Sequence, residues 1–269
     1  MTSNVLTRNN VKVSGKGTQP MIFAHGFGCD QNMWRYATPA FEDKFKIVLF
    51  DYVGAGHSDI HSYNKERYSN LAGYAEDVLE ICEALNLKDA IFVGHSVSSM
   101  VGALAAIKKP AYFSNIIMIG PSARYINDEG YLGGFDKKDI LELLNTMENN
   151  YIGWANFLAP AIMKNPGKPE LGAELTQSFC STDPVIARQF AEVTFLSDNR
   201  RDLEKVTTPS LIMQCSDDII APLEVGEYLH KNIPNSSLKV LEATGHCPHM
   251  SAPEETIRVI KEYLAMQSN

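Results

Sequence analysis

Short apolar runs recur along this chain, with residues at the spacing of amphipathic helices between several of them. In 71–85, for example, Leu71, Tyr74, Val78 and Cys82 share one helical face and acidic residues lie between them. A short unbroken apolar run is typical of a strand buried on both faces, as in a parallel sheet. Strands are predicted at 21–24, 46–50, 90–93, 116–119, 210–215 and 237–241. Strands that alternate with helices predict an α/β protein with a mostly parallel sheet and helices on both faces.

The start of the chain predicts a short hairpin. Val5–Asn9 and Val11–Gly15 flank Asn9-Asn10, whose side chains tolerate the left-handed backbone of a tight turn. We therefore expect two antiparallel strands there, joined at the asparagine pair.

The pattern changes between residues 122 and 198, where no buried strand is predicted and amphipathic helices follow one another. Asp136 and Asp183 are each placed to cap a helix, and Pro184 suits the first helical position after Asp183. Two more helices are predicted in 151–163 and 171–179. We interpret 123–198 as a helical lid inserted into one core, which is formed by 1–122 and 199–269.

Composition narrows the classes of function. The 269 residues are 45% hydrophobic and 21% charged, which suits one large core with an insertion. The formal net charge of -8 comes without basic clusters, so neither nucleic acid nor a membrane is an expected partner. No apolar stretch is long enough to span a bilayer, and Met1–Asn4 lacks the basic start of a secretory leader. Five scattered cysteines without a C-x-x-C pair indicate reduced thiols, and we expect a cytoplasmic protein.

A strand, a sharp turn and a helix meet at Gly94-His95-Ser96. The turn would expose Ser96 at the carboxyl edge of the sheet, where open α/β sheets bind ligands. The motif resembles the nucleophile elbow of the α/β-hydrolase superfamily, G-x-S-x-G, except that Ser98 replaces the last glycine. Taken alone, Ser96 could equally be a helix N-cap, so the assignment depends on partners elsewhere.

His25-Gly26-Phe27-Gly28 follows the first buried strand. It looks like the oxyanion loop of the same superfamily, although a plain strand-to-helix turn has similar residues. The resemblance implies that the backbone N–H groups of Phe27 and Val97 would stabilise a developing oxyanion.

A second glycine-containing turn, Asp51–Ser58, reads D-Y-V-G-A-G-H-S. It resembles a structural turn common in hydrolases of this fold. The glycine spacing does not fit the G-x-G-x-x-G loop of dinucleotide-binding proteins, and no cofactor is expected.

The partners of Ser96 come later in the chain. Acyl transfer by serine needs a base to take the hydroxyl proton and a carboxylate to orient that base. An acid after the strand at 210–215 and a histidine after the last strand give the order Ser, acid, His that the superfamily shows. The sequence therefore predicts a triad of Ser96, Asp218 and His246.

Two choices lie within this triad. Asp218 fits the superfamily pattern D-x-x-x-P with Pro222, which leaves Asp217 as its alternative. His246 follows Gly245 as in the family pattern G-H, whereas His249 is expected to pack or hydrogen bond beneath the loop. A metal cluster of the histidines with the cysteines nearby is disfavoured, because the ordered triad explains His246 better, and no metal is expected.

Aromatic residues gather in and near the predicted lid, and they indicate an apolar cavity for a small ligand. Most of them individually could only pack the lid helices together. The residues expected to line the cavity are His25, Tyr125, Trp154, Phe157, Phe190 and Phe195.

Longer runs resemble one branch of the superfamily, the RsbQ-like stress-signalling hydrolases and their plant relatives, the karrikin and strigolactone receptors. The runs are Phe23–Asp30, Phe50–Asp59, Gly94–Ser98, Tyr151–Ala155, Phe179–Pro184 and Gly245–Pro253. The plant proteins also carry serine at the position of Ser98. The resemblance implies a cytoplasmic positive regulator of a general stress response that acts with an RsbP-like PAS-domain phosphatase and hydrolyses a small ester or lactone-like ligand. The alternative is a metabolic carboxylesterase without a signalling partner.

Overall fold

The computed structural model describes residues 4–267 and contains a mostly parallel sheet. Residues 1–3 and 268–269 lie outside the described part. The prediction about a secretory leader concerned Met1–Asn4 and therefore falls mostly outside it. The sheet has seven strands in the order β1-β3-β2-β4-β5-β6-β7, and only β1 is antiparallel to its neighbour. The strands are β1 (Lys12–Ser14), β2 (Pro20–Ala24), β3 (Lys46–Leu49), β4 (Ala90–His95), β5 (Phe113–Ile119), β6 (Ser210–Asp217) and β7 (Ser236–Thr244). The expected α/β fold is confirmed.

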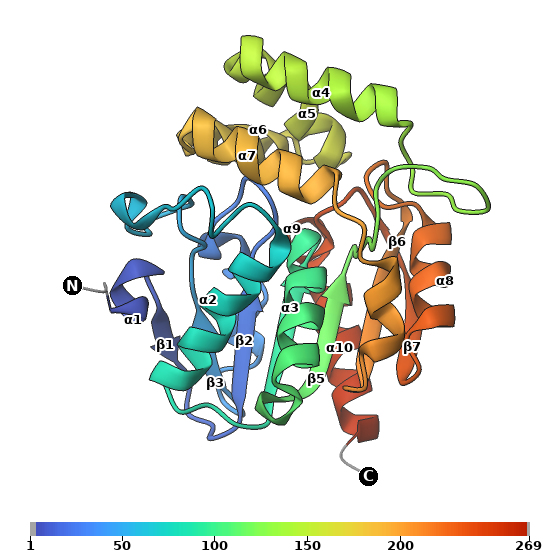
Figure 1. Ribbon diagram of the computed structural model, residues 1–269. Coiled ribbons are helices and arrows are strands. Elements are labelled where there is room, and N and C mark those ends of the chain that lie inside the picture. The colour runs from blue at the N-terminus through green and yellow to red at the C-terminus, as the bar shows by residue number, and fades with distance from the viewer. Residues whose placement is uncertain (1–3, 268–269) are drawn as a thin grey trace.

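Helices cover both faces of the sheet (Figure 1). One face packs against α2 (Leu71–Ala84), α3 (Val97–Lys108) and α8 (Leu223–Asn232). The other face packs against α9 (Pro248–Ser251), α10 (Pro253–Gln267) and the short 3-10 helices η1 (Gln31–Trp34) and η2 (Thr38–Ala40). Because both faces are covered, every residue of β2 and β4 is buried, which explains the unbroken apolar runs at 21–24 and 90–93. The remaining 3-10 helices are η3 (Ile60–Ser62), η4 (Pro110–Tyr112) and η5 (Arg200–Lys205).

Four helices lie between β5 and β6 in the chain, and Figure 1 shows them above the carboxyl ends of the strands. They are α4 (Lys137–Asn149), α5 (Tyr151–Met163), α6 (Pro169–Ser181) and α7 (Pro184–Phe195). Asp183 caps α7 as expected, accepting hydrogen bonds from the N–H groups of Val185 and Ile186. Asp136 precedes α4, but its carboxylate accepts from Asn127 and makes no cap hydrogen bond.

The expected hairpin at the start of the chain is wrong. Val5–Arg8 forms a short helix, α1, capped by the Asn4 side chain. The guanidinium of Arg8 contacts the carboxylates of Asp77 and Glu80 on α2, which fixes this helical turn against the core. The strand that follows, β1, pairs with β3.

Among residues 4–267, no helix is both long and apolar enough to cross a membrane.

Candidate active site

The candidate site lies where the strand order reverses. From β2 the chain runs outward to β3, whereas from β4 it runs the other way to β5, so β2 and β4 are neighbours at the switch point. Ala24 and Gly94 are paired in register, and the loops after them therefore leave the sheet side by side. Such a switch point at the carboxyl edge is where open α/β sheets place their ligands.

Ser96 occupies a strained turn between β4 and α3. Its backbone has φ 57° and ψ -125°, a combination that residues other than glycine rarely adopt. The turn is tight because the helix starts close to the strand: a Cβ on Gly94 would lie 2.6 Å from the carbonyl oxygen of Ser98. The strain is consistent with a turn that holds one hydroxyl in place.

Hydrogen bonds connect Ser96, His246 and Asp218 into a chain. The Oγ of Ser96 lies 2.8 Å from Nε2 of His246, and Nδ1 of His246 lies 2.6 Å from Oδ2 of Asp218. The other carboxylate oxygen of Asp218 accepts from the N–H groups of Ile220 and Ala221. A carboxylate held in this way keeps the proton of a neutral imidazole on Nδ1, so that Nε2 can accept the serine proton.

The structure separates the two candidate acids. Asp218 is buried against His246, whereas Asp217 is exposed and forms an ion pair with Lys164, with 2.5 Å between Nζ and Oδ2. The site therefore contains Asp218 and not Asp217.

Two further histidines, His95 and His249, form a buried cluster next to His246. The Nε2 of His95 donates to the carbonyl oxygen of His246 at 2.7 Å. The ring of His249 packs between those of His95 and Trp34, and neither of its nitrogens has a partner in the described residues. Burial, and after it the neighbouring imidazoles, lowers the pKa of both histidines, that of His249 to about 3. In residues 4–267, no group of three His, Cys, Asp or Glu side chains is arranged to hold a metal ion.

The loop after β2 is held by His25 and two hydroxyls. The Nδ1 of His25 donates to the carbonyl oxygen of Gly26 at 2.9 Å, and its Nε2 accepts from the backbone N–H of Tyr52 at 3.1 Å. The Ser98 hydroxyl donates to the carbonyl oxygen of His25 at 2.5 Å, so the Tyr52 hydroxyl, 2.8 Å away, must donate to Ser98. The buried hydroxyl that departs from the G-x-S-x-G pattern thus fastens this loop to the start of α3.

These contacts orient the peptide between Gly26 and Phe27. In a trans peptide, the N–H points opposite to the carbonyl of the preceding residue. Because His25 holds the Gly26 carbonyl on one side, the Phe27 N–H points to the other. Neither this N–H nor that of Val97, the first residue of α3, donates to an acceptor within residues 4–267, so both are free to bind an oxyanion.

The carboxyl end of α5 is hydrogen bonded to residues 245–247, the loop between β7 and α9 that contains His246 and is called the histidine loop here. The N–H of His246 donates to the carbonyl oxygen of Ile162 at 2.9 Å. The Asn165 side chain donates both to Met163, at 2.6 Å, and to Thr244, at 3.1 Å. Gly245 allows this approach, because its φ is +81° and a Cβ there would overlap the carbonyl oxygen of Met163. The position of α5 and that of His246 are therefore coupled.

A small cavity of about 30 Å³ lies above Ser96 and is called the Ser96 cavity here. This space holds little more than water, for which roughly 10–15 Å³ is the lower limit. Most of its wall is apolar, and its polar side chains are those of His95, Ser96, Tyr125, Thr194 and His246. The apolar part consists of Phe27, Cys29, Ile162, Leu175, Phe179, Phe195, Ile220 and Cys247.

The expected pocket residues fall into three groups. Tyr125 and Phe195 line the Ser96 cavity, and the Tyr125 hydroxyl lies 3.5 Å from Oγ of Ser96. Trp154 and Phe190 do not line it but pack against the ring of Phe27. His25 and Phe157 do not line the cavity.

His25 does not line the cavity, and its ring holds the loop after β2 through its bonds to Gly26 and Tyr52. Burial lowers its pKa. Phe157 is 79% exposed on the outer side of α5. The sequence analysis missed Ile162, Leu175 and Thr194, for which the sequence carries no signal beyond the helical spacing of α5, α6 and α7. It also missed Ile220, which lies in the loop after β6, two residues from Asp218.

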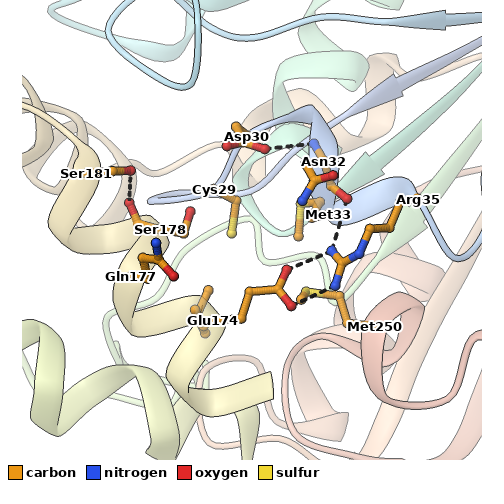
Figure 2. Close-up of a pocket in the computed structure, with 11 residues that line it drawn as sticks. Cys29, Asp30, Asn32, Met33, Arg35, Glu174, Gln177, Ser178, Ser181 and Met250 are labelled. Carbon is orange, nitrogen blue, oxygen red and sulfur yellow. Dashed lines mark hydrogen bonds and ion pairs between the residues drawn. The ribbon is translucent and has the colours of Figure 1, made fainter. Parts of the chain in front are cut away.

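A larger space, the outer cleft, lies beside the Ser96 cavity between α6 and the segment 29–35 (Figure 2). Its volume is about 420 Å³. Cys29 and Leu175 line both spaces and therefore lie between them. Across the cleft, both terminal nitrogens of Arg35 contact the carboxylate of Glu174 on α6, each at 2.6 Å. This bidentate ion pair connects α6 to the core.

Known proteins resemble this chain over nearly its whole length. Residues 19–253 match the family described as the alpha/beta hydrolase fold. A solved hydrolase from Oleispira antarctica is 46% identical, with 99% of this chain and 97% of that chain covered and a TM-score of 0.95. A karrikin insensitive 2 receptor from Petunia hybrida is 37% identical over 257 residues, 95% of each chain. A strigolactone esterase from Arabidopsis thaliana is 34% identical over 262 residues, 97% of this chain and 98% of its own. The chain belongs to the α/β-hydrolase family.

Proposed function

We propose that this protein is a serine hydrolase that cleaves small carboxylic esters or lactones. The observation that carries the proposal is the hydrogen-bonded chain from Ser96 through His246 to Asp218. Ser96 attacks the carbonyl carbon while Nε2 of His246 takes its proton, and Asp218 stabilises the imidazolium that forms. The N–H groups of Phe27 and Val97 stabilise the oxyanion. His246 then protonates the leaving alcohol, and water attacks the acyl-enzyme in the same way.

The substrate is small and mainly apolar. The wall of the Ser96 cavity consists largely of aromatic and aliphatic side chains. The cavity has a volume of about 30 Å³, so the wall must move to admit even a small ester. Ligand pockets more often measure roughly 300–1,000 Å³.

The hydrolase activity is tested with p-nitrophenyl esters of short acids and with Ser96→Ala. Removal of a triad member typically lowers kcat by several powers of ten. The Ser96 side chain lies at a turn and contributes little to the packing of the core, so its removal should not unfold the protein. We expect Ser96→Ala to stay folded, as measured by circular dichroism. Its activity should be at most about one part in a hundred of that of the wild type. Higher residual activity would reject Ser96 as the nucleophile.

We also propose that the hydrolase serves as a ligand sensor of the RsbQ type, acting in the cytoplasm on an RsbP-like PAS-domain phosphatase as a positive regulator of a general stress response. Two observations support this role. The resemblance extends into 151–155 and 179–184, which hydrolysis alone does not require. Relatives 34–38% identical are named as karrikin receptors or strigolactone esterases. A metabolic carboxylesterase without a partner is the second candidate, favoured by the complete triad.

Two measurements separate these roles. A sensor should hydrolyse esters slowly. It should also bind the phosphatase, and a bound ligand should change the affinity of that binding by about 5- to 150-fold, the usual range of allosteric coupling. A metabolic esterase should approach ordinary turnover, about 10 per second. The binding titration uses a PAS-domain phosphatase from the same genome, with wild type and Ser96→Ala. If the phosphatase does not bind and a strain that lacks this protein has a normal stress response, the metabolic esterase is the better interpretation.

A further inference from the structure

Thr194 presents an unpaired hydroxyl in the Ser96 cavity. The residue lies near the end of α7, is 1% exposed and lines the cavity. Within residues 4–267, its Oγ1 has no hydrogen-bond partner. Buried hydroxyls are nearly always paired, so this one requires an explanation.

Other threonines inside helices show what the hydroxyl would ordinarily do. Thr146, Thr176 and Thr256 each donate to the carbonyl oxygen four residues earlier, at 2.9, 2.9 and 3.1 Å. This is the usual local bond of a helical threonine. Thr194 has the same kind of carbonyl behind it, that of Phe190, but makes no bond to it. Its hydroxyl is therefore not held by its own helix.

The remaining polar side chains of the cavity have partners or face elsewhere. His246 and Ser96 bond to each other, and the Tyr125 hydroxyl lies near Ser96. His95 donates through Nε2 to the His246 backbone. Its unpaired Nδ1 faces the backbone of Gly26, because a Cβ on Gly26 would overlap that atom. Among the hydroxyl groups of the cavity wall in residues 4–267, that of Thr194 is thus the one with no partner within hydrogen-bond distance.

We propose that Thr194 is a specificity-determining residue, whose hydroxyl donates a hydrogen bond to a second oxygen of the substrate. The substrate is then an ester or lactone that carries an ether or carbonyl oxygen in addition to its reacting group, within an otherwise apolar skeleton. This inference rests on the proposed hydrolase function and narrows its substrate class. The hydroxyl that lacks a partner in the protein finds one in the bound ligand.

Binding is measured by NMR titration in the Ser96→Ala background, where turnover does not interfere. Each probe pair differs by one oxygen in place of a methylene: methoxyacetone against methyl propyl ketone, and methoxyethyl methyl ketone against methyl butyl ketone. The two pairs place the oxygen at successive distances from the carbonyl. The same comparison is made in Ser96→Ala/Thr194→Val, since valine keeps the shape of threonine and removes the hydroxyl.

We expect the hydroxyl to favour the oxygen-containing ketone of at least one pair by about 2- to 12-fold, the range for one neutral hydrogen bond. Thr194→Val should abolish this preference. Equal preferences in the two proteins for both pairs, or no binding of any ketone, would overturn the proposal.

Kinetics provide a second readout that separates this proposal from the hydrolase function. The kcat/KM values of p-nitrophenyl methoxyacetate and p-nitrophenyl butanoate are compared in wild type and Thr194→Val, so that the intrinsic reactivities cancel in the double ratio. Turnover that survives Ser96→Ala would contradict the hydrolase function without affecting the ketone comparison. Turnover that depends on Ser96 but has the same ester ratio in both proteins would contradict the role of Thr194.

Thermal stability is the last readout. Removing an unpaired buried hydroxyl relieves a desolvation cost, so Thr194→Val should raise Tm by about 2 °C or more. Thr256→Val is the matched control, because its hydroxyl is bonded to Ala252 and Tm should not rise. A fall in Tm for Thr194→Val as large as that for Thr256→Val would show that the hydroxyl is bonded within the protein and would overturn the proposal.

Discussion

At the scale of single residues, the neighbouring acids Asp217 and Asp218 make the sharpest comparison. Asp218→Asn keeps the shape of the side chain but favours the wrong tautomer of His246, and we expect kcat to fall by about four powers of ten, the usual cost of this change in serine proteases. Asp217→Asn removes only an exposed ion pair with Lys164 and should change kcat less than about threefold. Steady-state kinetics on one p-nitrophenyl ester decide, and the reverse ranking would move the acid to Asp217.

Ser98 gives a second prediction at this scale. Ser98→Ala removes the donor to the His25 carbonyl and loosens the loop that orients the Phe27 N–H. We expect kcat to fall about 10-fold with little change in KM, less than the 10²–10³-fold cost of losing an oxyanion donor itself.

Ser99→Ala is the control for Ser98→Ala. Ser99 is equally buried in α3, and its hydroxyl donates to Gly94, away from the oxyanion loop. An equal loss of kcat in the two variants would show a general effect on α3 rather than positioning of the loop.

The sequence located the residues that follow strands better than those inside helices. Ser96, Asp218 and His246 each follow a strand, and the carboxyl ends of parallel strands converge on one edge whatever the details of packing. Phe157 was expected in the pocket because α5 is almost wholly apolar, so no polar face indicated which side is buried. Trp154, three residues earlier, is 3% exposed, whereas Phe157 is 79% exposed.

At the scale of elements, α5 and the histidine loop depend on each other through Gly245. Gly245→Ala would place a Cβ against the carbonyl of Met163 and separate the loop from the helix. We expect kcat to fall at least 10-fold, because even a displacement of about 1 Å at a catalytic group can cost 10²-fold.

Gly130→Ala controls for backbone strain alone. Gly130 also has a positive φ, +68°, but nothing lies within 4 Å of the position of its Cβ. This variant should lose about 1–2 kcal/mol of stability and keep its kcat. If both variants kept full activity, the contact between α5 and the loop would have no part in placing His246.

The helices α4 to α7 were predictable from sequence, whereas the first element was not. Apolar residues recur at helical spacing in α4, α6 and α7, and the almost wholly apolar stretch 151–163 was predicted with the bounds that α5 has. Val5–Arg8 is helical because of contacts with α2, more than sixty residues away in the chain, between Arg8 and Asp77. Local sequence does not report such contacts, and it favoured a strand at Val5.

At the scale of the whole molecule, three buried histidines should make the fold sensitive to acid. Burial lowers the pKa of His25, His95 and His249 below the value near 6.5 that they have in the unfolded chain. Below pH 6.5 the unfolded chain therefore binds protons that the folded protein does not, and the free energy of unfolding falls as pH falls. For His249 this continues until about pH 3.

The measurement is urea unfolding between pH 7.5 and pH 5, followed by fluorescence. One such histidine contributes a slope of about 1.4 kcal/mol per pH unit once the pH is well below 6.5. We expect His249→Phe to reduce the slope by about this amount. His61→Phe is the control, because His61 is exposed to solvent in the folded state. An unchanged slope in His249→Phe would mean that His249 is protonated in the folded protein.

The small volume of the Ser96 cavity has a consequence for the time course of catalysis. Its wall must yield once when an ester enters the space of about 30 Å³ and again when the acid leaves. If these movements are slower than bond cleavage, kcat does not depend on the quality of the leaving group. Phenyl and p-nitrophenyl esters of one acid should then share a kcat that declines as sucrose raises the viscosity of the solvent. A ligand behind such a wall would have a residence time set by the protein rather than by its own affinity.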